Sequence, residues 1–294
     1  MIIETERLTK RYGAHRGIDD VTLDVAPGEI YGFLGPNGAG KTTTIRTLVG
    51  HLRPTAGRAR IFGLDVGTDP VAIHRRLGYL PGEFGLYDRL TGAQTADYFA
   101  HLHGGVDRDY RARLVERLGI DPGRRYRELS KGNKQKIGLL VVFQHRPELL
   151  ILDEPTSGLD PLVQQEFQAL LREARDEGRT VFLSSHVLSE VEAVCDRVAL
   201  IRDGRIVRTG RVAELRDLAH HQVVLRFAGT VPDAAFRSLP GVSDVEVTDH
   251  TLRLRVSGPM TPVLRAAAAY EVLDFESREP GLEETFLRSY EVAS

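Results

Sequence analysis

A glycine-rich stretch offers the clearest chemistry in this sequence. GPNGAGKTT, residues 35–43, fits the pattern G-x-x-x-x-G-K-[ST], follows the strand-like run EIYGFL and opens the helix-like run KTTTIRTLVG. Glycines let such a loop point its backbone N–H groups inward, and the start of a helix attracts anions. We therefore predict a phosphate site in which Lys41 bridges the β and γ phosphates and Thr42 binds Mg²⁺. The predicted site consists of Gly35, Pro36, Asn37, Gly38, Ala39, Gly40, Lys41, Thr42 and Thr43.

Two adjacent carboxylates can supply the other half of this chemistry. The run ELLILDEP, residues 148–155, predicts a buried strand that ends at Asp153 and Glu154. A carboxylate at the C-terminal end of a strand beside a phosphate loop can hold Mg²⁺, and the next one can orient the attacking water or accept its proton. We assign Asp153 to the metal and Glu154 to the water.

The elements around these motifs predict an α/β fold. Up to about residue 216, short apolar strands alternate with helical stretches, which is typical of a mostly parallel sheet covered by helices. A helix-rich interruption at about 88–145 predicts an inserted helical subdomain. From 220 to 294, strand-like runs such as HQVVLRFAG alternate with helical stretches at 231–238, 261–270 and 281–290. That pattern predicts a separate, small α+β domain.

Composition limits the possible partners. LSKGNKQKIG, residues 129–138, contains three of the five lysines, and a basic cluster can bind nucleic acid. The whole chain nevertheless has a net charge of −2 and a sequence pI near 6.6, so we expect no nucleic-acid partner. The longest apolar runs, such as IGLLVVF, are shorter than a membrane span, and we expect a soluble chain. The single cysteine, Cys195, is expected to be a buried thiol.

The order of the motifs resembles the nucleotide-binding subunit of ABC transporters. The resemblance rests on residues 35–43, LSKGN at 129–133, 148–154, SGLDP at 157–161 and the His186 that follows SS. It covers residues 1 to about 216, and it implies an ABC-type phosphate-loop ATPase domain that hydrolyses ATP with Mg²⁺. In that family two domains pair head to tail, and each ATP lies between the phosphate loop of one and the signature segment, usually LSGGQ, of the other.

Further roles follow from the resemblance. The signature residues Ser130, Lys131, Gly132 and Asn133 would contact the ATP bound by the opposite chain. Tyr12 would stack on adenine, Asp160 would lie at the dimer seam, and His186 would sense the γ-phosphate and help to place the water. Lys131 stands where the family usually has glycine. It either adds charge near that phosphate or is a solvated residue at a helix start.

One loop departs from the family pattern. After the LP pair of LGYLPGEFGLYDRLTG the family usually has a glutamine that reaches toward Mg²⁺, whereas this chain has Gly82 followed by Glu83. Glu83 could replace the missing oxygen ligand. Pro81-Gly82 also fits a tight turn that only aims the following loop, and we favour this interpretation.

The resemblance narrows further to subunits of drug and antibiotic exporters, through LSKGNKQK and EPGLEETFLRSY. It implies a second copy of the chain and a separate membrane permease as partners, the permease docking beside residues 82–90 and the helical subdomain. The chain would then lie on the cytoplasmic face of the membrane. The alternative is a soluble ABC-type ATPase of DNA repair or translation. Such proteins carry long coiled-coil insertions or two ATPase domains, and this chain has neither.

Overall fold

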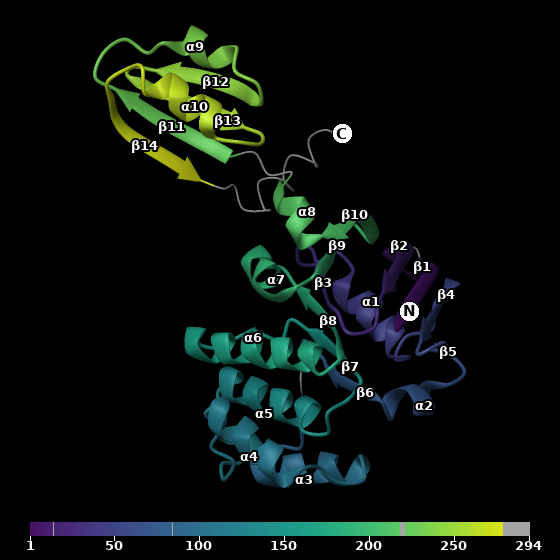
Figure 1. Ribbon diagram of the computed structural model, residues 1–294. Coiled ribbons are helices and arrows are strands. Elements are labelled where there is room, and N and C mark those ends of the chain that lie inside the picture. The colour runs from purple at the N-terminus through teal and green to yellow at the C-terminus, as the bar shows by residue number, and fades with distance from the viewer. Residues whose placement is uncertain (14, 84, 218–220, 279–294) are drawn as a thin grey trace. The chain divides into compact units, whose positions relative to one another are not determined.

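The fold was obtained as a computed structural model that describes residues 1–13, 15–83, 85–217 and 221–278 (Figure 1). The chain forms two compact units, Met1–Gly210 and Arg211–Ser294. The division falls a few residues before the predicted boundary at 216, and the second unit begins with a short helix, α8 (Val212–Asp217).

A six-stranded sheet forms the centre of the first unit. Its order is β10-β9-β3-β8-β7-β6, and every pairing from β9 to β6 is parallel. Strands β3, β7 and β8 are buried along their whole length, as expected for parallel strands covered on both faces. The strands are β3 (Ile30–Leu34), β6 (Leu77–Leu80), β7 (Leu149–Asp153), β8 (Thr180–Ser185), β9 (Arg197–Arg202) and β10 (Arg205–Arg211).

A second, antiparallel sheet in this unit has the order β2-β1-β4-β5. Its strands are β1 (Ile3–Tyr12), β2 (His15–Val25), β4 (Ala56–Ile61) and β5 (Leu64–Asp65). Buried side chains of both sheets and of helix α1 (Lys41–Leu48) share one apolar core. Within it, the ring of Phe182 lies 5.8 Å from that of Tyr31 and 5.4 Å from that of Phe33. This core fixes β3 and β8 side by side, with α1 starting beyond the end of β3.

The predicted helical subdomain contains α3 (Gly92–Leu102), α4 (Arg108–Arg117) and α5 (Lys131–Phe143), which lie together in Figure 1. A side chain caps the N-terminus of each helix: Thr91 and Gln94 form a capping box at α3, Asp107 caps α4 and Ser130 caps α5. The helix-rich character expected for residues 88–145 is confirmed by these three helices. The remaining helices of this unit are α2 (Pro70–His74), α6 (Pro161–Asp176) and α7 (Leu188–Val194).

The second unit is built on an antiparallel sheet of order β12-β13-β11-β14. Its elements are β11 (His221–Phe227), α9 (Asp233–Arg237), β12 (Val242–Thr248), β13 (Thr251–Val256), α10 (Thr261–Ala267) and β14 (Val272–Arg278). Alternate residues of β11 and β13 point into a core with Phe236 and Val263. The expected strands and the first two expected helices are confirmed. The third, at 281–290, lies outside the described residues.

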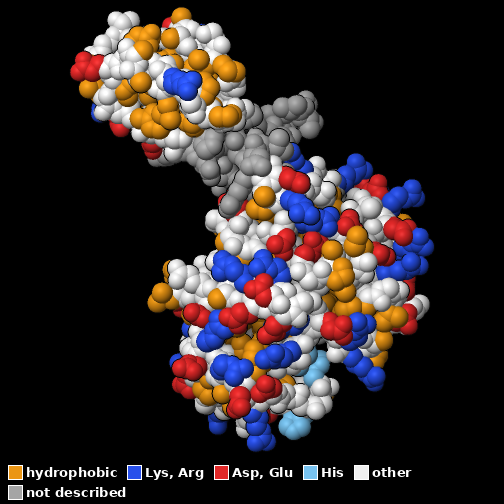
Figure 2. All heavy atoms as spheres, viewed as in Figure 1, with side chains coloured by type: hydrophobic (Ala, Val, Ile, Leu, Met, Phe, Trp, Pro, Cys, Tyr) orange, Lys and Arg blue, Asp and Glu red, His pale blue; other side chains and the backbone are white. Residues whose placement is uncertain are grey.

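Two further observations concern the charges on the surface and the possibility of a membrane-spanning helix. Figure 2 shows acidic and basic side chains interspersed over the first unit. Within the described part of the chain, no helix has both the length and the apolar character required to cross a bilayer.

Candidate nucleotide site

The parallel register brings the predicted chemical groups to one edge of the sheet. Leu34, which precedes the glycine-rich loop, is opposite Ser185, and Asp153 is opposite Ser184. Strand β8 therefore lies between the strand that carries the loop and the strand that carries the acidic pair. Because all three strands run in the same direction, their C-terminal ends form a single site.

The glycine-rich loop turns tightly between β3 and α1. Gly38 and Gly40 have φ values of 81° and 108°, in the left-handed region that favours glycine. Lys41, the first residue of α1, is buried, and its ammonium donates to the carbonyl oxygens of Gly35 at 2.6 Å and Pro36 at 3.2 Å. The loop thus folds around the lysine and places its positive charge at the helix start, where a phosphate is favoured.

Asp153 is held at the end of β7 by a serine that the motifs did not identify. The Ser184 hydroxyl donates to Asp153 Oδ1 at 2.6 Å and accepts a hydrogen bond from the Glu154 backbone N–H at 3.1 Å. Both side chains are fully buried, and Asp153 Oδ2 has no hydrogen-bond partner. Burial, reinforced by the charge of Asp153, raises the pKa of the nearby Tyr79 to about 12. An orphaned, buried carboxylate oxygen is well suited to a cation.

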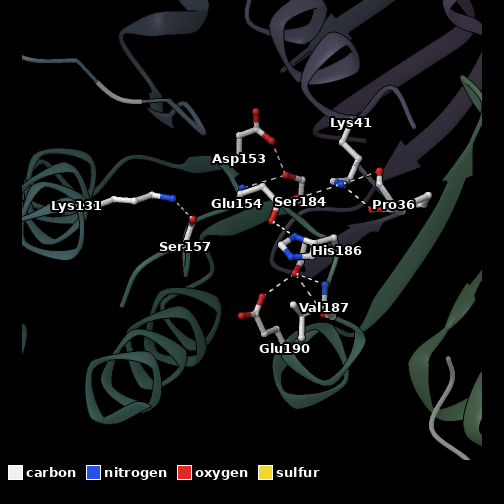
Figure 3. Close-up of polar contacts among 12 residues, drawn as sticks. Pro36, Lys41, Lys131, Asp153, Glu154, Ser157, Ser184, His186, Val187 and Glu190 are labelled. Atoms are coloured by element: carbon white, nitrogen blue, oxygen red, sulfur yellow. Dashed lines mark hydrogen bonds and ion pairs between the residues drawn. The ribbon is translucent and has the colours of Figure 1, made fainter. Parts of the chain in front are cut away.

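Glu154 lies between two groups that can act on a phosphate (Figure 3). Its Oε1 is 3.1 Å from the Lys41 ammonium, and its Oε2 is 2.7 Å from His186 Nδ1, which donates to it. The backbone of Glu154 has a φ of 51°, which turns the carboxylate out of the strand direction. The structure thus brings together Glu154 and His186, which the sequence analysis predicts to act on the attacking water and which are 32 positions apart.

Tyr12 lies beside the phosphate loop and is exposed, with 46% of its surface accessible. A Cβ on Gly17 would lie 2.8 Å from the Tyr12 ring and 3.2 Å from Thr43 Cγ2. Gly17 is thus a small residue at the junction between the ring and helix α1. The exposed ring is available for stacking on a flat ligand.

The signature residues lie at the start of helix α5. Ser130 caps α5 by accepting from the backbone N–H of Asn133 at 3.3 Å. The Lys131 ammonium donates to the Ser157 hydroxyl at 2.8 Å, and Figure 3 shows this pair on the far side of Glu154 from Lys41. A Cβ on Gly132 would lie 2.3 Å from the carbonyl oxygen of Gly158, so only glycine fits there. The contacts of Ser130, Lys131 and Gly132 described here are with α5 itself and with the loop 155–160.

Asp160 caps helix α6, because its carboxylate accepts from the backbone N–H of Val163 at 3.0 Å. This hydrogen bond and the Lys136 ammonium, 3.8 Å away, hold the pKa of Asp160 below its usual value. The side chain is exposed, so it can contact another chain while it caps the helix.

Gly82 and Glu83, where the sequence departs from the family pattern, differ in their position relative to Asp153. A Cβ on Gly82 would lie 3.3 Å from Asp153 Oδ2, so this position is next to the orphaned oxygen. Glu83 is exposed. Glycine at residue 82 therefore leaves open the space over Asp153 in which a longer side chain would lie.

The donor set suits a small, oxygen-preferring cation. Thr42 offers a hydroxyl at the start of α1, and Asp153 offers its free carboxylate oxygen. Among the described residues there is no group of three or more His, Cys, Asp or Glu side chains that could hold a metal alone. A cation here would thus share its coordination with phosphate oxygens and water, as Mg²⁺ does in nucleotide sites.

These features define a phosphate-loop nucleotide hydrolase with an α/β core. Comparison with known proteins agrees: residues 18–157 match the family model described as ABC transporter. The chain is 34% identical over 257 residues to the bacitracin transport ATP-binding protein BcrA of Enterococcus faecalis, covering 86% of this chain and 83% of the relative. It is 37% identical over 302 residues to the daunorubicin resistance ATP-binding protein DrrA3 of Streptomyces coeruleorubidus, covering 97% and 94%.

A solved structure of an ATP-binding subunit of an ABC transporter is also similar. It has a TM-score of 0.68 and 30% identity, and the match covers 74% of this chain and 92% of that one. The chain belongs to the ABC transporter family and is an ATP-binding, ATP-hydrolysing subunit. The fold and the family predicted from the sequence are therefore confirmed.

Proposed function

We propose that this chain drives a separate membrane permease of a drug or antibiotic exporter by hydrolysing ATP between two copies of itself. The observation that carries the proposal is the position of Glu154, between Lys41 at 3.1 Å and His186 at 2.7 Å. The signature serine, Ser130, belongs to another surface of the chain. A complete site therefore requires a second chain.

The residues of one chain bind the nucleotide. The backbone of residues 35–43 and the Lys41 ammonium hold the β and γ phosphates, and the exposed ring of Tyr12 stacks on adenine. The Thr42 hydroxyl and Asp153 Oδ2 would hold Mg²⁺, which would neutralise charge on the phosphate oxygens.

Glu154 and His186 act on the attacking water. Glu154 orients the water and accepts its proton, and the hydrogen bond from His186 Nδ1 fixes the carboxylate for this role. His186 is half-exposed, so its other ring nitrogen can contact the γ-phosphate. Ser184 holds the strand end that carries both acids.

The second chain supplies the remaining contacts. The Ser130 hydroxyl and the backbone N–H of Gly132, at the start of the 13-residue helix α5, face the γ-phosphate of the opposite chain. Lys131 and Asn133 flank this contact, and Asp160 lies at the seam between the chains. ATP binds the closed dimer more tightly than the open one, and this difference supplies the work.

Transport is supported by the relatives, which are named as bacitracin transport and daunorubicin resistance ATP-binding proteins. We place the permease beside residues 82–90 and the helical subdomain, and the chain on the cytoplasmic face of the membrane. A groove of about 640 Å³ between α2, α3 and α5, bordered by the helical subdomain, offers a largely apolar surface. The alternative, a non-transport ATPase of repair or translation, is not favoured by these names.

A substitution of the water-activating residue tests the dimer. Glu154→Gln keeps the size and polarity of the side chain but loses its charge, so it should bind ATP and hydrolyse it very slowly. Gel filtration with ATP and Mg²⁺ should then show a stable dimer, whereas the same chain with Lys41→Ala added should elute as a monomer. A Glu154→Gln chain that stays monomeric at saturating ATP would contradict the mechanism.

A further inference from the structure

The loop that follows Glu154 is attached along one face of helix α5. Gln135 Nε2 donates to the carbonyl oxygen of Pro155 at 2.9 Å, and Gly132 packs against the backbone of Gly158. Lys131, next to Gly132 and one turn before Gln135, belongs to the same helix face. The signature helix and the loop 155–160 therefore form one connected surface within the chain.

Lys131 makes the outermost of these contacts with its whole side chain. Its ammonium donates to the Ser157 hydroxyl at 2.8 Å, and its Cγ and Cδ lie 3.4 and 3.5 Å from the position of a Cβ on Gly158. The contact is at the surface, where a lysine normally remains mobile in water. Lys131 instead extends along the loop and lies against Gly158, which is exposed.

Ser157, which Lys131 contacts, is itself hydrogen-bonded to the backbone of Glu154. The Ser157 backbone N–H donates to the carbonyl oxygen of Glu154 at 3.2 Å and closes a turn over residues 154–157. Glu154 has a positive φ of 51°, a conformation that a non-glycine residue keeps only when its surroundings impose it. The contacts thus run from Lys131 through Ser157 to the backbone of Glu154.

We propose that Lys131 is a positioning residue for hydrolysis: it holds Ser157 and thereby the turn that sets the direction of the Glu154 carboxylate. Ser130, the adjacent residue, contacts the nucleotide of the opposite chain under the proposed function. Lys131 therefore connects the phosphate contact that a chain makes in its partner's site with the carboxylate of its own site. The inference rests on the proposed role of Glu154.

A double-mutant cycle tests this contact. Lys131→Met keeps the aliphatic stem and removes the ammonium, and Ser157→Ala removes only the hydroxyl. Each should lower kcat about tenfold with KM for ATP changed less than about twofold, since a charge-assisted hydrogen bond that orients the reacting group is lost. The double variant should be no slower than the slower single variant, because both remove the same contact.

Two controls separate positioning from general damage. Lys131→Arg, which retains a donor of similar reach, should recover at least about half of kcat. Lys134→Met removes a neighbouring lysine whose ammonium lies over the Tyr126 ring, 5.0 Å from its centroid, and it should leave kcat unchanged. Thermal unfolding of every variant checks that the first unit remains folded.

Other outcomes would overturn the proposal. A raised KM for ATP with unchanged kcat in Lys131→Met, together with normal activity of Ser157→Ala, would make Lys131 a direct phosphate ligand. Additive losses, or normal kcat in both single variants, would also contradict it. Both side chains belong to one chain, so the cycle measures their contact whether or not two chains pair. Failure of the dimer mechanism appears separately, as a monomeric Glu154→Gln chain.

Discussion

At the scale of single residues, the site depends on a buried serine as much as on the acids of the motif. Ser184 donates to Asp153 and accepts from the Glu154 backbone, so one hydroxyl sets the positions of two functional residues. Nothing in its immediate sequence marks it, since serine near the end of a strand is common. The available signal was indirect. Strands β7 and β8 are parallel, and Ser184, the first serine of SSH, lies opposite Asp153 at the end of β7.

Removal of this hydroxyl should therefore affect both stability and rate. Ser184→Ala leaves a buried carboxylate oxygen and a backbone N–H without their partner, which costs about 1–3 kcal/mol of the free energy of unfolding. We also expect a loss of kcat, because Asp153 and Glu154 lose their common support. Ser184→Thr, which retains the hydroxyl, should recover most of the rate. Urea unfolding and ATPase assays would measure the two effects, and a wild-type rate in Ser184→Ala would contradict the assignment.

The glycine at residue 82 leads to a second prediction at this scale. Because Gly82, not Glu83, is next to Asp153 Oδ2, we expect Glu83→Ala to keep basal ATPase activity within about twofold. Gly82→Gln would place an amide over Asp153 and should change the Mg²⁺ dependence of the rate. ATPase assays over a range of Mg²⁺, with and without permease, would measure both. A hundredfold loss in Glu83→Ala with weakened Mg²⁺ affinity would make Glu83 a metal ligand.

At the scale of elements, the sequence predicted those helices and strands whose structure a single local pattern determines. The strands β3 and β7, the helices α3 and α4, and the four strands of the second unit all follow from apolar periodicity and turn residues. Contacts between elements could not be predicted in this way. The attachment of Ser157 to Lys131, for example, depends on how α5 packs beside the loop after β7, and no local pattern encodes it.

The packing of α3 against α5 gives a prediction for pH. The rings of His103 and His145, which follow these helices, stack with centroids 3.7 Å apart. Burial and the neighbouring His103 lower the pKa of His145 from 6.5 to about 4. The unfolded chain therefore binds a proton that the folded chain does not, and this contribution destabilises the fold as pH falls from about 6.5 to 4.

Substitution of His145 isolates this effect from other titrating groups. His145→Gln should lose less stability than wild type between pH 7 and pH 4, and the difference should reach about 3 kcal/mol. Above pH 7 the two curves should run parallel. Urea unfolding at a series of pH values provides the measurement, and identical pH slopes for the two proteins would show that His145 titrates normally in the fold.

At the scale of the whole molecule, we propose that one chain is half of two sites. Lys41, Asp153, Glu154 and His186 meet at the ends of three parallel strands. Ser130 and Gly132 lie at the start of α5, on either side of Lys131, whose ammonium donates to Ser157. A head-to-tail pair of chains would join the two halves twice, with the same surfaces in both sites.

Mixing two inactive variants tests this claim most directly. Lys41→Ala removes the phosphate lysine, and Ser130→Asp keeps a helix-capping carboxylate at α5 while it repels the partner's phosphate. Each variant alone should be inactive. In a head-to-tail dimer of one Lys41→Ala chain and one Ser130→Asp chain, both substitutions lie in the same site, and the other site is intact.

Equal amounts of the two variants, allowed to exchange subunits, should recover about a quarter of wild-type ATPase activity, because half of the dimers are mixed and each has one intact site. Lys41→Ala mixed with Asp153→Asn is the matched control. Lys41 and Asp153 both belong to the nucleotide-binding half of a chain. In a mixed dimer each of the two sites therefore contains one of the two substitutions, and no activity should return. Recovery with Ser130→Asp and none in the control is the predicted result. An absence of recovery with Ser130→Asp, or equal recovery in both mixtures, would contradict a site shared between two chains.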